Sequence, residues 1–154
     1  DGPAPRKPTD DAATKAPSDD FAEHRGGIPF VDGFARGMAR VRLTGRPPLF
    51  YVTTRDCVYC VKLAQSAFRD RDVLGALTHF TPVLIDGEAE SGVAAKYGVA
   101  SFPTTVFADL AGKESSQVRG FVETDVFLAA VRKAVKACEA GEPRQRAGPR
   151  RAET

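Results

Sequence analysis

Apolar and polar residues follow two different patterns of spacing along the central part of the chain. Short apolar runs bounded by proline, glycine or aspartate predict buried β-strands, and apolar residues spaced three or four apart predict helices. Strands are predicted at 49–54, 80–86, 104–108 and 117–121. Helices are predicted at 31–43, 57–68, 72–77 and 89–97, and from Thr124 along a stripe of Phe127, Val131, Val135 and Cys138.

The order of these elements indicates the fold class. Two strands separated by a helix imply a parallel pair joined by a right-handed crossover. The last two strands are joined around Ala111-Gly112-Lys113, a hairpin signal that adds antiparallel pairing. The sequence therefore predicts an α/β protein with a small mixed parallel/antiparallel sheet flanked by helices on both faces.

Composition sets the expected boundaries of the packed region. The length of 154 residues suits one domain, predicted at 28–140. Residues 1–27 predict a disordered N-terminal tether, because Phe21 is their only large apolar residue. Residues 141–154 predict a basic disordered C-terminal tail. Its arginines could contact acidic lipid or nucleic acid, but we expect a solvated terminus.

Charge and hydropathy exclude several classes of function. The formal net charge of +2 is too small to favour nucleic acid or an acidic membrane as the main partner. No apolar run reaches the roughly 18 residues that a spanning helix needs, so we expect no integral membrane segment. The chain begins with Asp1 and shows no export signal, which leaves either a processed precursor or a trimmed sequence.

Cys57 and Cys60 carry the candidate chemistry. They follow a predicted strand and open a predicted helix. At that place the first sulfur lies at the exposed helix terminus, where unpaired N–H groups and the helix dipole favour a thiolate. The second sulfur lies about one turn further in and can displace a mixed disulfide. The pair therefore predicts thiol–disulfide exchange.

Zinc is the rival use of such a pair, but it usually demands four ligands. The two histidines each stand alone: His24 falls in the predicted tether, and His79 is expected at the surface or at a strand edge. We therefore expect no metal and no other cofactor. Cys138 lies on the apolar stripe of the last helix, which predicts a buried and inert thiol.

Two separated motifs resemble the thioredoxin superfamily. The segment Arg46–Val52 followed by Cys57–Lys62 resembles its active-site strand and helix, and Ala94–Thr104 is similar to its Tyr-Gly-Val…Pro-Thr signature. Gly120-Phe121 resembles the final strand before the last helix. Phe68–Val73 is similar to a step found in one branch, which contains the C-terminal domain of DsbD-type thiol–disulfide interchange proteins and related exported proteins.

The resemblance implies a thioredoxin-like fold and assigns roles to site residues. Cys57 would be the attacking cysteine and Cys60 the resolving one. The residues expected to contact an extended substrate segment are Val58, Tyr59, Phe102 and Pro103, with Pro103 following a cis peptide bond.

Three departures from the family pattern concern the same site. Asp56 stands where many members have tryptophan, Tyr51 replaces a buried acid, and Pro82 replaces the lysine partner of that acid. The proton-transfer arrangement of thioredoxin is therefore missing, so we expect slower exchange, assisted by water or by Tyr51. The Asp56 carboxylate could destabilise the Cys57 thiolate by roughly 0.7 kcal/mol, which nearly cancels the stabilisation that the helix terminus gives. Alternatively, Asp56 caps the helix by accepting hydrogen bonds from its backbone N–H groups.

These observations predict a protein thiol–disulfide oxidoreductase that reduces, or relays electrons to, partner protein disulfides. Its partners would be protein dithiol or disulfide substrates and a redox partner, and we expect a monomer. An extracytoplasmic location, periplasmic or exported, is expected from the branch, with a cytoplasmic one as the alternative. The alternative function is a redox-idle binding module that presents its groove to a protein.

Overall fold

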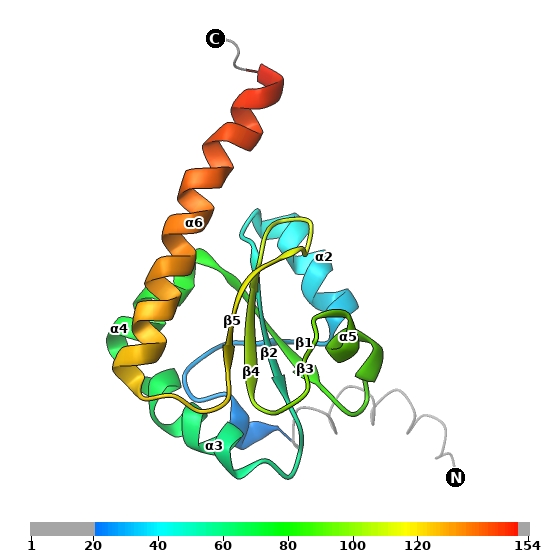
Figure 1. Ribbon diagram of the computed structural model, residues 1–154, viewed down its shortest axis with the longest axis vertical. Helices are drawn as coiled ribbons and strands as arrows, with labels where there is room; N and C mark the ends of the chain where they lie inside the picture. Colours follow the sequence, from blue (N-terminus) through cyan, green and yellow to red (C-terminus); the bar gives the residue numbers. More distant parts are fainter. Residues whose placement is uncertain (1–20, 151–154) are drawn as a thin grey trace, which may run out of the picture.

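The computed structural model describes residues 21–150 of the chain, which form a five-stranded sheet with helices on both faces (Figure 1). In space the strand order is β1-β3-β2-β4-β5. The strands are β1 (Val31–Asp32), β2 (Pro48–Thr53), β3 (Thr81–Asp86), β4 (Thr104–Ala108) and β5 (Glu114–Arg119). The α-helices are α2 (Phe34–Thr44), α3 (Val58–Gln65), α4 (Arg71–Ala76), α5 (Ser91–Lys96) and α6 (Thr124–Arg150). Short 3₁₀ turns are η1 (Ala22–His24), η2 (Ala67–Arg69) and η3 (Leu77–His79).

The sheet is mixed, as predicted. β3 runs parallel to both β1 and β2, whereas β4 is antiparallel to β2 and β5 is antiparallel to β4. β2 lies at the centre, and all six of its residues are buried. A central strand covered on both faces must be apolar throughout, which is why Pro48–Thr53 shows no polar alternation.

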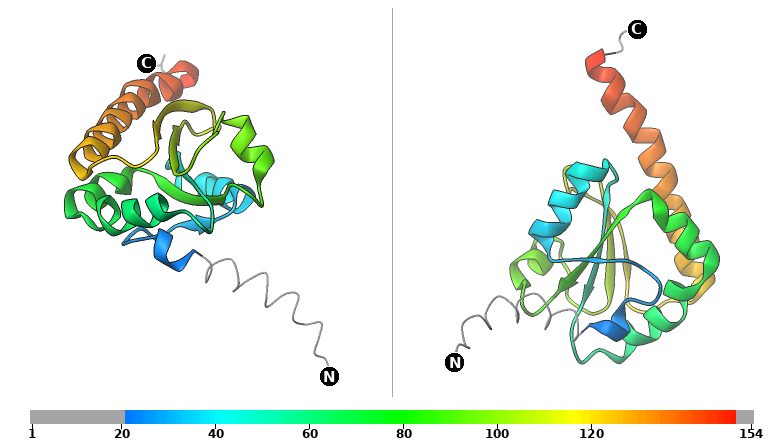
Figure 2. Two further views of the ribbon diagram at one scale, coloured as in Figure 1. Left: turned by 60° about the horizontal axis from the view of Figure 1, so that its bottom comes forward. Right: turned by 180° about the vertical axis from the view of Figure 1, so that it is seen from behind.

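Alternate residues of β2 enter two separate hydrophobic cores. Leu49 and Tyr51 pack on one face with side chains of α3, η2, α4 and α6. Phe50 and Val52 pack on the other face, where α2 and α5 lie. Figure 2 shows this arrangement from two further directions. The predicted α/β class with helices on both faces is confirmed.

The helix predicted at 31–43 begins later than expected. Val31 and Asp32 form the edge strand β1, paired with Val83 and Leu84 of β3, and the helix begins at Phe34. Gly33 separates the two elements with φ of 93°, a conformation that favours glycine. Apolar spacing alone could not separate a two-residue strand from the helix that follows it.

The packed region also begins earlier than predicted. The tether was expected to reach residue 27, yet Phe21 and His24 are only 3% and 2% exposed. The edge of one ring meets the face of the other, with centroids 5.0 Å apart. The expectation is therefore wrong for 21–27, and residues 1–20 lie outside the described part.

The last helix extends past the predicted boundary at residue 140. The backbone of α6 is helical to Arg150, so a disordered tail is not what the structure shows for 141–150. The helix continues through Gly141 and Pro143, although both residue types have low helix propensity. Residues 151–154 lie outside the described part. Among the described residues, no helix combines the length and the apolar character needed to span a bilayer.

Candidate active site

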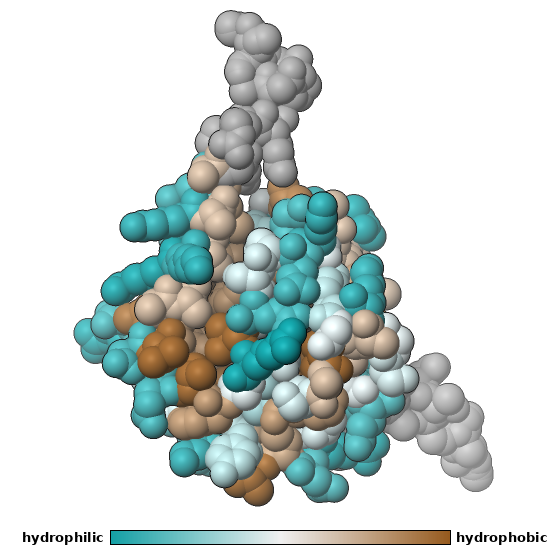
Figure 3. All heavy atoms as spheres, viewed as in Figure 1, coloured by the Kyte–Doolittle hydropathy of each residue, from teal (hydrophilic) through white to brown (hydrophobic). Residues whose placement is uncertain are grey.

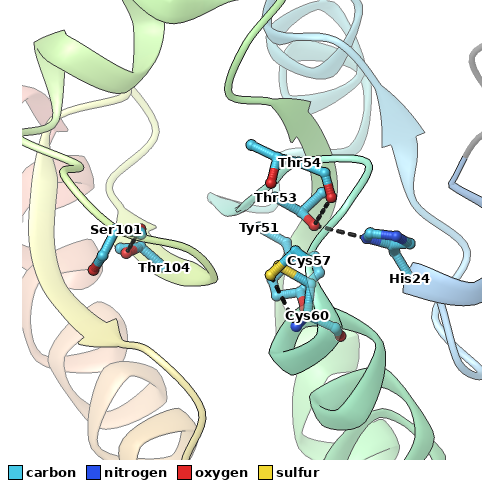
Figure 4. The surroundings of a disulfide bond; sticks show 8 residues. All are labelled: His24, Tyr51, Thr53, Thr54, Cys57, Cys60, Ser101 and Thr104. Carbon is cyan, nitrogen blue, oxygen red and sulfur yellow. Dashed lines mark hydrogen bonds between the residues drawn. A yellow bond between two sulfur atoms is a disulfide. The ribbon is translucent and has the colours of Figure 1, made fainter.

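The two cysteines of the motif form a disulfide where the chain passes from β2 into α3 (Figure 4). Their Cα atoms are 5.2 Å apart. Cys57 is the N-cap residue of α3, and its Sγ accepts a hydrogen bond from the Cys60 backbone N–H at 3.1 Å. The helix terminus therefore donates directly to the first sulfur, as the sequence suggested.

The two sulfurs differ in exposure. Cys60 is 0% exposed and packs in the core between β2 and α3, whereas Cys57 is only partly buried. An external disulfide can therefore reach Cys57 alone. The alternative in which Asp56 caps the helix is wrong, because Cys57 occupies the cap position and Asp56 is an exposed residue before it.

Tyr51 lies directly beneath the first turn of α3. Its hydroxyl donates a hydrogen bond of 2.8 Å to the Cys60 carbonyl oxygen. The ring stacks on Phe30, with centroids 5.7 Å apart, and meets Phe68 edge-on at 4.7 Å. Burial raises the pKa of Tyr51 far above its ordinary value, so the hydroxyl keeps its proton and supports the helix turn.

The loop that precedes β4 belongs to the surroundings of the disulfide (Figure 4). The Phe102–Pro103 peptide bond is cis, Pro103 is buried, and Phe102 is partly buried against both cores. The Pro103 carbonyl accepts from Gly120 N–H at 2.6 Å, which connects this loop to the end of β5. A Cβ on Gly87 would come within 2.8 Å of Phe102 Cζ, so the absence of a side chain there makes room for this ring.

Two exposed apolar residues follow Cys57 directly in the chain. Val58 and Tyr59 are 77% and 57% exposed, unusual values for residues of their size. The Tyr59 ring lies 6.4 Å from that of Phe121, and the Lys62 Nζ stands 4.8 Å from the Phe121 centroid. In the space-filling view, hydrophobic side chains gather near the junction of β5 with α6 and at the lower edge, where α3 lies (Figure 3).

Phe121 and Lys62 were not predicted as site residues. Phe121 was predicted as the last residue of a strand, but β5 ends at Arg119, and the residue falls in the connection to α6. The only signal in the sequence was its place after a glycine, a residue that favours turns. In the structure, Gly120 has a φ of 78°. Tyr59, one of the residues predicted to contact substrate, therefore lies beside an aromatic residue, Phe121, and a cationic one, Lys62.

His24 is the second residue that sequence reasoning misplaced. It was assigned to the tether, but its Nδ1 lies 2.7 Å from the Thr53 hydroxyl oxygen at the end of β2 (Figure 4). Burial lowers the pKa of His24, an effect that nearby Glu23 and a hydrogen bond with the Arg55 backbone oppose. His79 is exposed, as expected. In the described part of the chain, no group of three or more His, Cys, Asp or Glu side chains could hold a metal ion.

Cys138 lies far from the disulfide, in the middle of α6. It is partly buried, where full burial was predicted, and lines a surface pocket with Arg46, Pro47 and His79. Its side chain also packs against the core that contains Cys60. The position separates it from any exchange at Cys57.

Comparison with known proteins places this architecture in a class. A family model described as a thioredoxin-like domain matches residues 34–135. The chain belongs to this thioredoxin-like family. A search among curated proteins found no match to the sequence.

Solved structures with the same fold include redox proteins. A thioredoxin from Thermus thermophilus superposes with a TM-score of 0.62 at 22% identity, covering 70% of this chain and 88% of that one. The oxidised C-terminal domain of DsbD from Neisseria meningitidis gives 0.57 at 19% identity, covering 65% and 90%. The DsbH oxidoreductase gives 0.56 at 19% identity, covering 72% and 88%. At these identities the likeness shows the fold alone, while the family match confirms the predicted resemblance to the thioredoxin superfamily. The resemblance to the DsbD-type branch stays a prediction.

Proposed function

We propose that this chain is a protein thiol–disulfide oxidoreductase that acts through Cys57 and Cys60. One observation carries the proposal: the two cysteines form a disulfide at a helix N-terminus, and only Cys57 is accessible. A structural disulfide gains from burial of both sulfurs, whereas an exchanging one needs one exposed sulfur for attack and one covered sulfur for resolution.

The exchange proceeds in two steps, attack by Cys57 and resolution by Cys60. In the reduced protein the Cys57 thiolate attacks one sulfur of a partner disulfide, the partner S–S bond breaks, and the departing partner thiolate takes up a proton. The Cys60 thiolate then attacks Cys57 Sγ in the mixed disulfide and releases the second partner thiolate, which is protonated in turn. Two electrons pass from the protein dithiol to the partner, and the Cys57–Cys60 disulfide forms.

The second step is the slower one in this proposal. Cys60 must lose its proton, but the buried polar side chains of the described residues are a histidine and four threonines, with no carboxylate among them. Tyr51 keeps its own proton and donates to the Cys60 carbonyl. Water that reaches Cys60 once the disulfide opens is therefore the proposed proton acceptor, and the expectation that Tyr51 could itself assist finds no support.

The residues around Cys57 form the proposed docking site for substrate. Val58 and Tyr59 offer exposed apolar surface beside the partly buried Phe121, and the loop at Phe102 and Pro103 offers backbone for pairing with an extended segment. Net reduction of partner disulfides, a monomeric state and an extracytoplasmic location complete the proposal. The direction and the location derive from the resemblance to the DsbD-type branch, and all three points stay predictions.

Trapping with Cys60→Ser tests the function. Serine cannot resolve the mixed disulfide, so reductant-sensitive complexes should accumulate with a model substrate such as insulin, while Cys57→Ser should form almost none. Insulin reduction with dithiothreitol as the electron source should require both cysteines. If the doubly substituted variant still retains a protein partner and the wild type reduces no disulfide, the alternative of a redox-idle binding module replaces the oxidoreductase.

A further inference from the structure

His24 is a buried polar residue close to the disulfide that the exchange steps above do not use. The ring is 2% exposed, and Nδ1 lies 2.7 Å from Thr53 Oγ1, an oxygen on a residue that is itself 0% exposed. Thr53 ends β2, and residues 54–56 connect it to Cys57. A buried polar contact between segments 29 residues apart holds both at a fixed place, since either group would lose its partner if they separated.

The segment that carries His24 is docked on the helical layer and on β1 by contacts of its own. Gly27 N–H donates to the Phe68 carbonyl at 2.8 Å, and Arg25 pairs with Asp32 at 2.7 Å. Gly26 has φ of 55°, and a Cβ there would stand 2.5 Å from the Ala64 carbonyl oxygen, so the backbone approaches α3 closely. His24 is thus presented from a rigid support.

The ring contacts the end of β2 at the Thr53 hydroxyl, four residues before Cys57. The charged groups that act on the ring are Glu23 and Arg25, its own neighbours, and burial keeps the ring neutral by lowering its pKa. In Figure 4 the ring approaches the connection from one side, and the loop with Ser101 and Thr104 lies on the other.

We propose that His24 is a positioning residue, which fixes the connection between β2 and Cys57 and thereby holds the Cys57 thiol at Cys60. In the disulfide state Cys57 is also held by its bond to buried Cys60, but in the dithiol state only the backbone holds it. Preorganisation raises the effective concentration of one thiol at the other and so favours the disulfide. The family match begins at Phe34, so His24 lies outside it. The inference rests on the proposed function only in requiring that both redox states form.

The test is the redox equilibrium with glutathione, in which protein dithiol and glutathione disulfide give protein disulfide and two glutathione thiols. Thr53→Val keeps the shape and removes the hydroxyl, and His24→Phe keeps a ring and removes the hydrogen bond to Thr53. Each should shift the equilibrium toward the dithiol by about threefold to tenfold, the worth of one buried hydrogen bond. Thr53→Ser, which retains the hydroxyl, should stay within about twofold of the wild type. The double variant should shift no further than His24→Phe alone, because both changes remove the same contact.

Ile28→Val provides the control for stability, since Ile28 is buried in the same segment and only loses a methyl group. If Thr53→Val and His24→Phe lower the melting temperature as this control does and leave the glutathione equilibrium unchanged, the role of His24 is structural and the proposal is wrong. A wild type that equilibrates with glutathione but reduces no protein disulfide would refute the proposed function. The comparison among variants would still decide the role of His24.

Discussion

The two ends of the sheet each carry a histidine and a cysteine, in opposite settings. Where β2 ends, His24 is buried against Thr53, and Cys57 opens α3 in a disulfide. Where β2 begins, His79 is exposed and its Nδ1 lies 3.1 Å from the Ala76 carbonyl of its own helical turn, beside Cys138 in a shallow pocket. The same residue types are thus combined twice with different surroundings.

The difference shows that position in the fold decides what these residues can do. At the carboxyl end of β2 the chain turns into a helix N-terminus, which supplies N–H donors to a sulfur. At the opposite end Cys138 lies in the middle of α6, where the helix N–H groups are already paired. Chemistry is therefore expected at one end only, and the following experiments test that contrast from the largest effect to the smallest.

Cysteine substitutions should give the largest contrast. Cys57→Ser should lower insulin reduction on the order of a hundredfold or more, because the nucleophile is lost. Cys138→Ser should keep wild-type activity. Insulin turbidity assays on the two purified variants measure this directly, and a large loss in Cys138→Ser would mean that both ends take part.

Alkylation of the reduced protein should separate the thiols by rate. Iodoacetamide should label Cys57 at least about tenfold faster than Cys60 or Cys138, because the helix terminus favours its thiolate and the thiol is accessible. Peptide mapping over a time course gives the three rates. Equal rates at Cys57 and Cys60 would contradict the assigned roles.

Removal of one tyrosine hydroxyl at each end of the sheet should lower the free energy of unfolding by similar amounts. Only one of the two changes should affect the exchange reaction. Tyr51→Phe leaves the Cys60 carbonyl without its donor, and Tyr97→Phe does the same to the Gly112 carbonyl in the β4–β5 hairpin. Each should lower the free energy of unfolding by about 1–3 kcal/mol in denaturant titrations. Only Tyr51→Phe should also change the rate at which the mixed disulfide resolves, since Tyr97 lies at the end of the sheet without the disulfide.

The smallest effect is the pH dependence of stability. The pKa of His24 is lowered in the folded protein, so below about pH 6.5 the unfolded chain takes up a proton first and unfolding is favoured. The contribution is fully present above that pH and is lost as the pH falls. His24→Phe should remove this part of the acid destabilisation, which denaturant titrations at a series of pH values would measure. Identical profiles for wild type and His24→Phe would show that the ring does not titrate in this way.

Much of the fold was predictable because its information is local. The residues of β2 form one unbroken apolar run, and the cysteines sit at the strand-to-helix step that their chemistry needs. The resemblance supplied Phe102 and Pro103, which no pattern of spacing would have joined to Cys57. The structure brings all of these residues to one end of the sheet.

The missed features depend on contacts distant in sequence. Phe21 looked like an isolated apolar residue, but it is buried because the glycines at 26 and 27 let the backbone pass close to α3 and η2. His24 finds its partner 29 residues later, and β1 exists only because β3 pairs with it. The composition of the segment predicted a tether. Neither the close approach of its backbone to α3 nor the pairing of β1 with β3 can be seen in the local sequence.

The short span of the disulfide has a consequence for chain entropy. The two cysteines are only three positions apart, so the bond closes a very small loop. Loop-closure entropy assigns such a bond roughly 2 kcal/mol, against about 4.7 kcal/mol for a loop of 100 residues. Opening it therefore releases little conformational freedom, and the two cores on either side of the sheet keep their packing. Repeated cycles of reduction and oxidation can then proceed within a chain that stays folded throughout.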